Sequence, residues 1–327
     1  MAKLHTLRLG TRASPLALAQ SRQVARALEH AHAGLAVALI EISTTGDRVT
    51  GKSLKSFGGA GVFVKELETA LLERRIDIAV HSLKDLPTRQ PRGLLVAAIS
   101  QREDPRDAVV TRNGVALNQL PVGSIVGSGS PRRRAQLKAR FPNLEFAEIR
   151  GNVETRLRKV DEGQFAATIL ALAGLNRIGL QARASAVLPF EIMLPAPGQG
   201  ALGIECRARD GSARRVLKVL HDPLIAACVQ AERALLEALG GGCHLPLGAL
   251  GEIAKRKSIR GGKQTASSTL RLRAVLAHPD GSLTIAHERS GSIRAPQALG
   301  RALAKDLLRL GGAELIARLR EEGMDGV

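Results

Sequence analysis

Short apolar runs alternate with helix-like patterns over roughly the first two thirds of the chain, and this alternation constrains the fold more than any other feature. Runs rich in Val, Ile and Leu are typical of buried strands, whereas apolar residues three or four positions apart are typical of helices. The first series is predicted as strand, helix, strand, helix, strand, at residues 7–11, from Ser14, 37–43, 62–74 and 76–81. This order predicts parallel strands covered by helices, with ligand sites at the carboxyl ends of the strands.

A polar, turn-rich stretch at residues 100–106 leads into a second series of the same kind. Strands are predicted at 108–111, 124–127, 144–149 and 166–171, with helices from Pro131 and over 153–161. The segment Pro195–Gly200 then forms a second crossing between the lobes, after which residues 201–207 are predicted as a strand that returns to the first sheet. Two crossings predict a hinge.

The pattern changes near Leu220, where a third, smaller domain is predicted. It consists of a long helix through Leu239, a glycine-rich turn, two or three strands between residues 247 and 289, and a final helix from Ala295. The basic segment 254–268 within it is interpreted as a solvated loop. The fold class is therefore α/β, with two doubly wound lobes and a smaller α/β third domain. The predicted boundaries are residues 1–100 with 200–219 for the first lobe, 101–199 for the second and 220–327 for the third domain.

The charge balance indicates an anionic partner, because 48 basic residues face 30 acidic ones and leave a net charge of +18. Unpaired nucleic acid is disfavoured, since a chain with no Trp, no Tyr and six Phe offers little on which bases can stack. Small polyanionic ligands are the rival class. Apolar stretches fall well short of the roughly 18 residues of a membrane span, and charged residues interrupt the first twenty positions. We therefore expect a cytoplasmic protein that does not bind a membrane, and the low aromatic count speaks against nucleic acid as its partner.

A cationic helix start follows the strand predicted at 124–127. Ser130 stands at the N-cap and Pro131 at the first helical position, so Arg132, Arg133 and Arg134 occupy the first turn. The helix dipole opposes each exposed cation there by roughly 0.3–1 kcal/mol, which an anion would offset. A carboxylate or phosphate pocket is one interpretation. A solvated basic turn facing a nucleic-acid backbone is the other, and these residues alone leave both open.

Further basic and hydroxyl side chains stand at corresponding junctions between strands and helices: Arg12 with Ser14, Arg150, Arg156 and Arg177. In a doubly wound lobe such positions converge on one ligand site, although each arginine taken singly is more simply a surface ion-pair partner.

The strand predicted at 76–81 ends in His81, Ser82, Lys84 and Asp85, and Pro87 stops the segment. A carboxylate among cations stays ionised and can stabilise a reaction cation, and a proton on it can serve general acid catalysis. The plainer interpretation makes Asp85 a turn residue paired with Lys84, and His81 a core histidine that holds a backbone group.

Three cysteines without a CxxC pair argue against a disulfide framework and against a metal site. Cys206 and Cys228 lie in apolar surroundings typical of buried thiols. Cys243 follows three glycines, which suits either a covalent tether or a tight C-cap turn with an incidental thiol.

Eight segments, in this order and spacing, resemble the porphobilinogen deaminase family. They are Arg12-Ala-Ser-Pro-Leu-Ala, Ser43-Thr-Thr-Gly-Asp47, Phe63-Val-Lys-Glu-Leu-Glu68, Val80-His-Ser-Leu-Lys-Asp85, Ser130-Pro-Arg-Arg133, Arg150-Gly-Asn-Val153, Ala196-Pro-Gly-Gln-Gly-Ala201 and Gly241-Gly-Cys243. The match runs from Leu7 to about Gly248, and the remainder looks like the third domain of the family.

The resemblance implies a transferase of tetrapyrrole and heme biosynthesis that condenses four porphobilinogen molecules head to tail, with loss of ammonia and final release of hydroxymethylbilane. It also implies a monomer whose first two lobes look like periplasmic binding proteins. Asp85 matches the catalytic carboxylate, and Cys243 the cysteine that carries one dipyrromethane cofactor by a thioether. The positions implied to bind cofactor are Ser82, Lys84, Asp85, Ser130, Arg132 and Arg133, and those implied to bind substrate are Arg12, Ser14, Arg150, Arg156 and Arg177.

The implied chemistry agrees with the residues, because each pyrrole carries an acetate and a propionate that an arginine-lined site would hold. Two positions depart from the family pattern: Ala60 replaces a frequent lysine, with Lys55 nearby, and Pro131 replaces an apolar residue. The alternatives are a cytoplasmic small-anion binding protein of the two-lobed periplasmic-binding type and a basic nucleic-acid-binding module.

Overall fold

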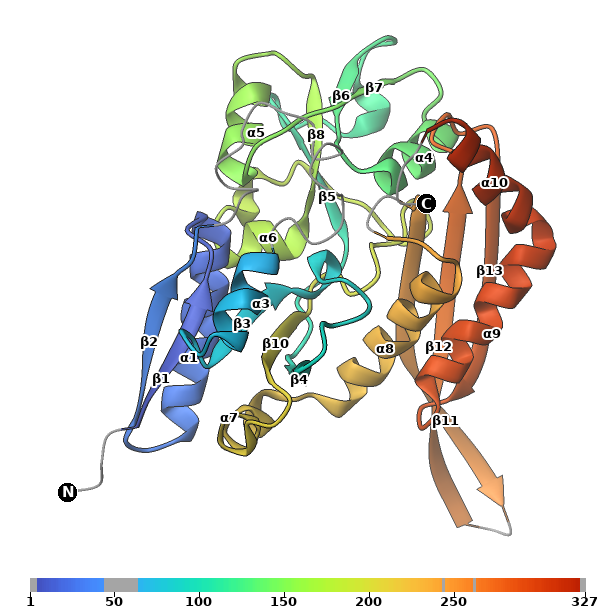
Figure 1. Ribbon diagram of the computed structural model, residues 1–327. Coiled ribbons are helices and arrows are strands. Elements are labelled where there is room, and N and C mark those ends of the chain that lie inside the picture. Colours follow the sequence, from blue (N-terminus) through green and yellow to red (C-terminus); the bar gives the residue numbers. More distant parts are fainter. Residues whose placement is uncertain (1–4, 44–63, 243–244, 261–262, 324–327) are drawn as a thin grey trace.

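Three β-sheets, each with its own helices, make up the protein (Figure 1). The computed structural model describes residues 5–43, 64–242, 245–260 and 263–323, and for residues 255–260 and 263–268 it describes the backbone alone. Within the described residues no helix is both long and apolar enough to cross a membrane.

The first sheet has the strand order β2-β1-β3-β10-β4. Its strands are β1 (His5–Thr11), β2 (Leu35–Glu41), β3 (Ile78–Ser82), β4 (Leu94–Ile99) and β10 (Leu202–Arg207). Helices α1 (Pro15–Ala31) and α7 (Gly211–Leu217), the latter continued by η5 (Lys218–Leu220), pack on one face, and α3 (Lys65–Leu72) packs on the other. The lobe is thus wound on both faces, as predicted.

Strand β10 confirms the predicted return of the chain to the first sheet. It nevertheless runs antiparallel to both β3 and β4, so the expectation of purely parallel strands is wrong for this part of the sheet. The chain re-enters the first lobe from the second one, at the end where β3 finishes, and must therefore run back along the sheet. Strand β4 was not predicted.

The second sheet has the order β7-β6-β8-β5-β9. Its strands are β5 (Asp107–Thr111), β6 (Ile125–Gly127), β7 (Glu145–Ala147), β8 (Ala167–Ala171) and β9 (Ala186–Val187). Helix α4 (Pro131–Arg140) covers one face, and α5 (Val153–Asp161) with α6 (Leu172–Arg177) covers the other. Short 3-10 turns η3 (Leu117–Gln119) and η4 (Gln181–Arg183) complete the lobe. Strand β5, which enters from the first lobe, is antiparallel to β8 and β9.

The third sheet is antiparallel, in the order β11-β12-β13, and packs against helices through one apolar core. Its elements are α8 (Pro223–Ala238), β11 (Leu247–Arg260), β12 (Lys263–Ala277), β13 (Thr284–Ser292), α9 (Pro296–Leu307), the π-helical turn η6 (Leu308–Gly312) and α10 (Ala313–Glu321). The α/β fold with two doubly wound lobes and a smaller third domain is confirmed.

Two predictions for this third domain are wrong. The segment 254–268 is not a loop, because β11 and β12 stay paired in unbroken register as far as Arg260 and Lys263 and extend as a hairpin (Figure 1). The prediction weighed charge, Gly and Ser, whereas continuous pairing satisfies the backbone of both strands. The predicted single final helix is two helices, since Gly311 takes a φ of 102° between them.

Candidate functional site

Lys84 and Asp85 lie in the 3-10 turn η2 (Leu83–Asp85), directly after the buried strand β3. Asp85 is exposed and Lys84 is half-buried. Burial lowers the pKa of the Lys84 ammonium to about 8, and the nearby negative charge of Asp85 opposes that shift. Lys84 Nζ donates a hydrogen bond to Gln199 Oε1 at 3.3 Å. The plainer interpretation of the sequence pairs Asp85 with Lys84, and the hydrogen bond of the ammonium described here reaches the second crossing instead of the turn.

The other hydroxyls predicted for the first lobe lie near α1. Ser14 is the N-cap of α1, and its oxygen accepts a hydrogen bond from the backbone N–H of Ala17 at 3.3 Å. Ser82 accepts one from Gln20 Nε2, also on α1, at 2.8 Å. Arg12 stands between β1 and α1 and is half-buried. Helix α1 thus holds the predicted hydroxyls of this lobe in place.

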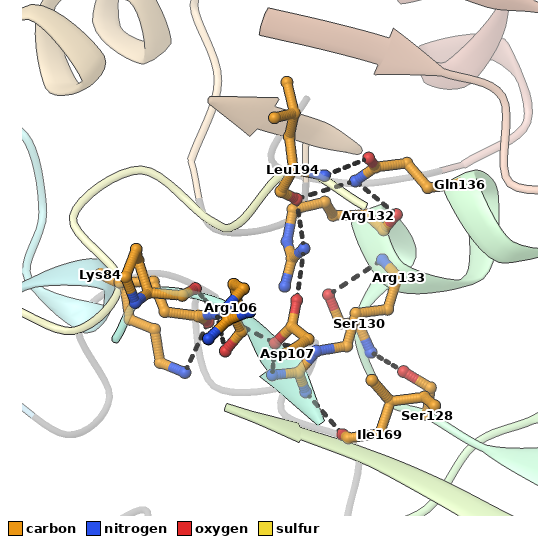
Figure 2. Close-up of polar contacts among 12 residues, drawn as sticks. Lys84, Arg106, Asp107, Ser128, Ser130, Arg132, Arg133, Gln136, Ile169 and Leu194 are labelled. Atoms are coloured by element: carbon orange, nitrogen blue, oxygen red, sulfur yellow. Dashed lines mark hydrogen bonds and ion pairs between the residues drawn. The ribbon is translucent and has the colours of Figure 1, made fainter. Parts of the chain in front are cut away.

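Arg132 and Arg133 of the second lobe share one buried carboxylate, that of Asp107 at the start of β5 (Figure 2). Asp107 is 0% exposed, and the two arginines are 4% and 6% exposed. Arg132 Nη1 lies 2.8 Å from Asp107 Oδ2 and donates to the Leu194 carbonyl at 2.6 Å. Arg133 donates to Asp107 Oδ1 at 2.8 and 3.1 Å and to the Ile169 carbonyl at 2.9 Å. The first turn of α4 is therefore neutralised in part from inside the lobe.

The electrostatics of this trio follow from its burial. Burial alone would raise the pKa of Asp107, but the positive charges of Arg132 and Arg133 outweigh that effect and hold it well below its usual range. Burial, with the like charge of Arg133, lowers the pKa of Arg132. Ser130 caps α4, accepting from the backbone N–H of Arg133 at 3.4 Å, with Pro131 in the first turn as predicted.

Arg156 links the two lobes electrostatically. It stands in the first turn of α5, where its Nε donates to the Gly151 carbonyl at 2.8 Å. Burial lowers its pKa to about 10; the positive charge of Arg133 adds to the shift, and the negative charge of Asp85 in the other lobe opposes it. Arg150 is paired at the rim with Glu148 at 2.5 Å. Asp85, Arg133, Arg150 and Arg156, named from separate motifs, are therefore brought into one neighbourhood.

Arg177 lies apart from these residues, next to the two crossings. Its Nη2 donates to the Gly200 carbonyl of the second crossing at 2.6 Å. Burial lowers its pKa to about 10, and the charge that opposes this shift is Glu103 of the first crossing. The structure thus places Arg177 against the crossings.

The site fits a group that carries several carboxylates. Among the described residues whose charges most affect Lys84, Arg132 and Arg156, the cations Lys84, Arg132, Arg133, Arg150 and Arg156 outnumber the carboxylates Asp85, Asp107 and Glu148. In addition, the Nε atom of Arg132 is buried without a hydrogen-bond partner among the described residues. Buried donors of this kind normally have partners, so an anionic ligand would complete the arrangement.

Comparison with known proteins decides the family. The family model described as "Porphobilinogen deaminase, dipyromethane cofactor binding domain" matches residues 7–215, and "Porphobilinogen deaminase, C-terminal domain" matches residues 226–309. The porphobilinogen deaminase of Chromobacterium violaceum is 46% identical over 314 residues, which are 96% of this chain and 98% of the relative. The chain belongs to the porphobilinogen deaminase family. The resemblance of the motifs is confirmed, as are its implications that the chain is an enzyme and has a dipyrromethane-binding domain.

Solved structures of ligand-binding domains are more distant. A methionine binding protein, MetQ, is 15% identical with a TM-score of 0.43, over 66% of this chain and 89% of MetQ. The effector binding domain of BenM with benzoate is 18% identical with a TM-score of 0.39, over 66% of this chain and 90% of that domain. No functional conclusion is drawn from likenesses at this level.

The cysteines of this porphobilinogen deaminase family member divide as predicted where the structure describes them. Cys206 and Cys228 are buried, and burial raises the pKa of their thiols to about 11 and about 12, which leaves them protonated at neutral pH. Cys243 lies outside the described residues, as do Lys55 and Ala60. Just beyond the cysteine segment, Gly248 packs so closely that a Cβ there would lie 2.9 Å from Gln136 Nε2.

Three contacts of the site escaped prediction. Asp107 was placed just outside a predicted strand, although a carboxylate at the start of a buried run is a usable signal for an internal counter-ion. The sequence analysis places Gln199 in a crossing but predicts no contact for its side chain. No sequence pattern indicates the hydrogen bonds of Gln136 with the Leu194 backbone. His81 is a core histidine, but its partner is the Glu205 carboxylate at 3.1 Å and not a backbone group.

Proposed function

We propose that this protein polymerises four porphobilinogen molecules head to tail on a covalently bound dipyrromethane primer and releases hydroxymethylbilane. The observation that supports this proposal most directly is that Asp85, an exposed carboxylate of the first lobe, lies close enough to Arg156 of the second lobe for its negative charge to affect the pKa of that arginine. Family membership gives the class of reaction, and this arrangement supplies a cationic site for an acidic chain beside one carboxylate.

The residues proposed to hold the cofactor are Ser82, Lys84, Ser130, Arg132 and Arg133, with Cys243 as its thioether anchor. When bound, the cofactor supplies a nucleophilic pyrrole carbon to which the first substrate is joined. Arg132 offers its buried Nε to an anion, while Asp107 holds its Nη1 atom in place. A guanidinium group that is already held in place loses less side-chain entropy when it binds a carboxylate.

The residues proposed to bind substrate are Arg12, Ser14, Arg150, Arg156 and Arg177. Arg156 fits this role best, because burial and Arg133 both disfavour its charge when no anion is present. An acetate or propionate placed beside it would relieve that cost.

Asp85 is proposed as the catalytic residue. When the protonated aminomethyl group of the substrate leaves as ammonia, its C–N bond breaks and an electron-poor azafulvenium cation remains, whose positive charge the carboxylate of Asp85 stabilises. The α-carbon of the acceptor pyrrole then forms the new C–C bond with this cation, and the same carboxylate accepts the proton that this carbon loses and hydrogen-bonds the ring N–H. Its exposure leaves it open to each incoming ring.

The test of this proposal is Asp85→Asn, which keeps the shape and removes the charge. Turnover of porphobilinogen should fall by about 10²–10⁴-fold, with the fold unchanged. Asp161→Asn is the matched control, because Asp161 is an exposed carboxylate paired with Arg183, and it should leave turnover unchanged. Unaltered turnover in Asp85→Asn removes Asp85 from the mechanism.

Intact-mass analysis tests the cofactor and separates this proposal from the two binding-protein alternatives. The purified protein should carry an adduct of two pyrrole units, and Cys243→Ser should lack it. An active protein without any adduct contradicts the proposal. A cytoplasmic location, a monomeric state and the absence of nucleic-acid binding remain predictions, and size-exclusion chromatography checks the second of these.

A further inference from the structure

Gln199, on the second crossing, joins charged groups from the two lobes. Its side chain is almost completely buried, and the residue is 1% exposed. Its Nε2 donates to the Pro105 carbonyl at 2.7 Å and to Asp107 Oδ1 at 3.0 Å, while its Oε1 accepts from Lys84 Nζ at 3.3 Å. An amide donates on one side and accepts on the other, so it connects a carboxylate to an ammonium without adding net charge.

The backbone on either side of Gln199 is fixed by glycines. Gly198 and Gly200 have φ values of 77° and 90°, which residues with a side chain rarely adopt. A Cβ on Gly200 would also lie 2.3 Å from the Glu103 carbonyl oxygen of the first crossing. This backbone therefore holds the side chain of Gln199 between the two crossings.

A buried carboxylate of the third domain anchors the same segment. Glu232 on α8 is 0% exposed, and its Oε2 accepts from the Gly198 N–H at 2.7 Å. Its Oε1 accepts from Arg102 Nη1 at 2.6 Å and from the Gly251 N–H at 2.8 Å. Arg102 also donates from Nε to the Gln199 carbonyl at 2.8 Å. Both crossings and the third domain thus meet at Gln199.

We propose that Gln199 is a positioning residue of the polymerisation: it holds the Lys84 ammonium beside Asp85 and ties it to the carboxylate that fixes Arg132 and Arg133. This inference rests on the proposed function for its link to catalysis. Among the described residues, the charged groups that most affect Lys84 are Asp85 on its own turn, Asp107 on β5, and Arg132 and Arg133 on α4.

The acceptor oxygen of Gln199 and the two guanidinium groups have opposite effects on the pKa of Lys84. Burial and the positive charges of Arg132 and Arg133 favour neutral Lys84, whereas Asp85, Asp107 and a hydrogen bond to Gln199 Oε1 favour the ammonium. The ammonium is the form that binds a carboxylate of the cofactor. Gln199 therefore acts on the chemistry through the protonation and position of another side chain.

Two substitutions of similar shape separate this role from simple packing. Gln199→Met removes donor and acceptor together, so the pKa of Lys84 should fall by about one unit. Gln199→Glu keeps an acceptor for the ammonium but loses the donor to Asp107 and the Pro105 carbonyl. Because Lys84, Arg132 and Arg133 keep the added carboxylate ionised, the pKa of Lys84 should rise by about one unit. The pKa is measured by competitive labelling of Lys84 with acetic anhydride across pH, with peptide mass spectrometry as readout.

Gln164 is the matched control, because it is exposed and also donates to a carboxylate, Glu162 Oε2, at 2.8 Å. Gln164→Met and Gln164→Glu should leave the Lys84 titration where it is in the unaltered protein. In the Gln199 variants, the alkaline limb of kcat/KM for porphobilinogen should move in the same direction as the labelling.

The two proposals fail separately. A Lys84 titration that stays in place, or moves the same way in both Gln199 variants, overturns the role of Gln199 even if the protein consumes porphobilinogen. Conversely, a protein that does not consume porphobilinogen fails the proposed function, while opposite shifts in labelling still establish the hydrogen-bond role of Gln199. If Gln199→Met does not fold, absence of the upward shift in Gln199→Glu is sufficient to reject the inference.

Discussion

Two pairs of arginines, both next to strand ends of the second lobe, have opposite surroundings. Arg132 and Arg133 are buried and share the carboxylate of Asp107 inside the lobe. Arg150 and Arg156 follow the next strand and are half-buried; Arg150 pairs with an exposed glutamate, and Arg156 is held by a backbone carbonyl. The first pair is held by an internal carboxylate before any ligand arrives, whereas the partners described for the second pair are an exposed carboxylate and a backbone carbonyl.

The contrast shows what a run of arginines at a helix start signifies. Three cations in one turn predict an anion, and here one anion is internal. Buried charges need partners of their own, so the arginines of such a run serve partly to shape the site. Which arginines are free for a ligand depends on carboxylates far away in the sequence.

Asp107→Asn should produce the largest effect, because it leaves two buried guanidinium groups without a counter-ion. We expect the free energy of unfolding to fall by about 3–5 kcal/mol, measured by urea denaturation at neutral pH. The low pKa of Asp107 in the folded protein also implies stability that is present above about pH 4 and lost as the pH falls below it. The variant should therefore lose less stability on acidification than the unaltered protein, and an equal loss would contradict this account of the buried pair.

Arg156→Gln should have the next largest effect. In contrast to Asp107→Asn, it should lower activity and leave stability intact. We expect kcat/KM for porphobilinogen to fall by about 10- to 100-fold, since a charge-assisted hydrogen bond to a substrate carboxylate is lost. Stability should be unchanged or slightly higher, because burial and Arg133 both disfavour the Arg156 charge. Steady-state kinetics and urea denaturation of one preparation check both parts. A clear loss of stability with normal kinetics would assign Arg156 to the structural pair.

Lys84→Arg tests whether the pH dependence of kcat/KM is set by the charge of this side chain. Burial lowers the pKa of Lys84 to about 8, so its ammonium, and with it kcat/KM, should decline as the pH rises through about 8. An arginine keeps its charge to higher pH, so the alkaline limb of the variant should move upward by more than one unit. Titration of the substrate amine affects both proteins alike and cancels in the difference. A limb in the same place would show that Lys84 does not govern it.

Glu148→Gln should have the smallest effect. Glu148 pairs with Arg150 at 2.5 Å, but its side chain is 53% exposed, and exposed ion pairs contribute about 0–1 kcal/mol. Urea denaturation should therefore show less than a third of the change seen for Asp107→Asn. A comparable loss would remove the distinction between the two pairs.

The sequence predicts local structure here better than it predicts contacts. Ser130 and Pro131 correctly predict the start of α4, because helix capping depends on residues close together in the sequence. The apolar run at 201–207 likewise predicts β10. The direction of β10 depends on the path of the chain through another lobe, which no local pattern encodes. The hairpin at 254–268 was missed for a similar reason, since pairing between strands does not depend on their composition alone.

The sequence named several charged side chains that the structure brings together, but it did not name the partners of those side chains. Asp85 and Arg156 lie in one neighbourhood, as the motifs suggested. That Arg133 faces Asp107, or that Lys84 reaches Gln199, follows from how two lobes and two crossings meet in space. Sequence patterns identify the charged groups, and the tertiary structure decides which charges cancel.

Helix α8 carries Glu232, which fastens both crossings, and it ends at Ala238, shortly before Cys243. Any rotation of one lobe relative to the other must therefore either break the bonds of Glu232 or carry α8 along. In the second case the angle between the lobes and the stem of the cysteine segment change together. Under the proposed function, in which Cys243 anchors the product chain, a change of the angle between the lobes would then also shift the segment that leads to the anchor.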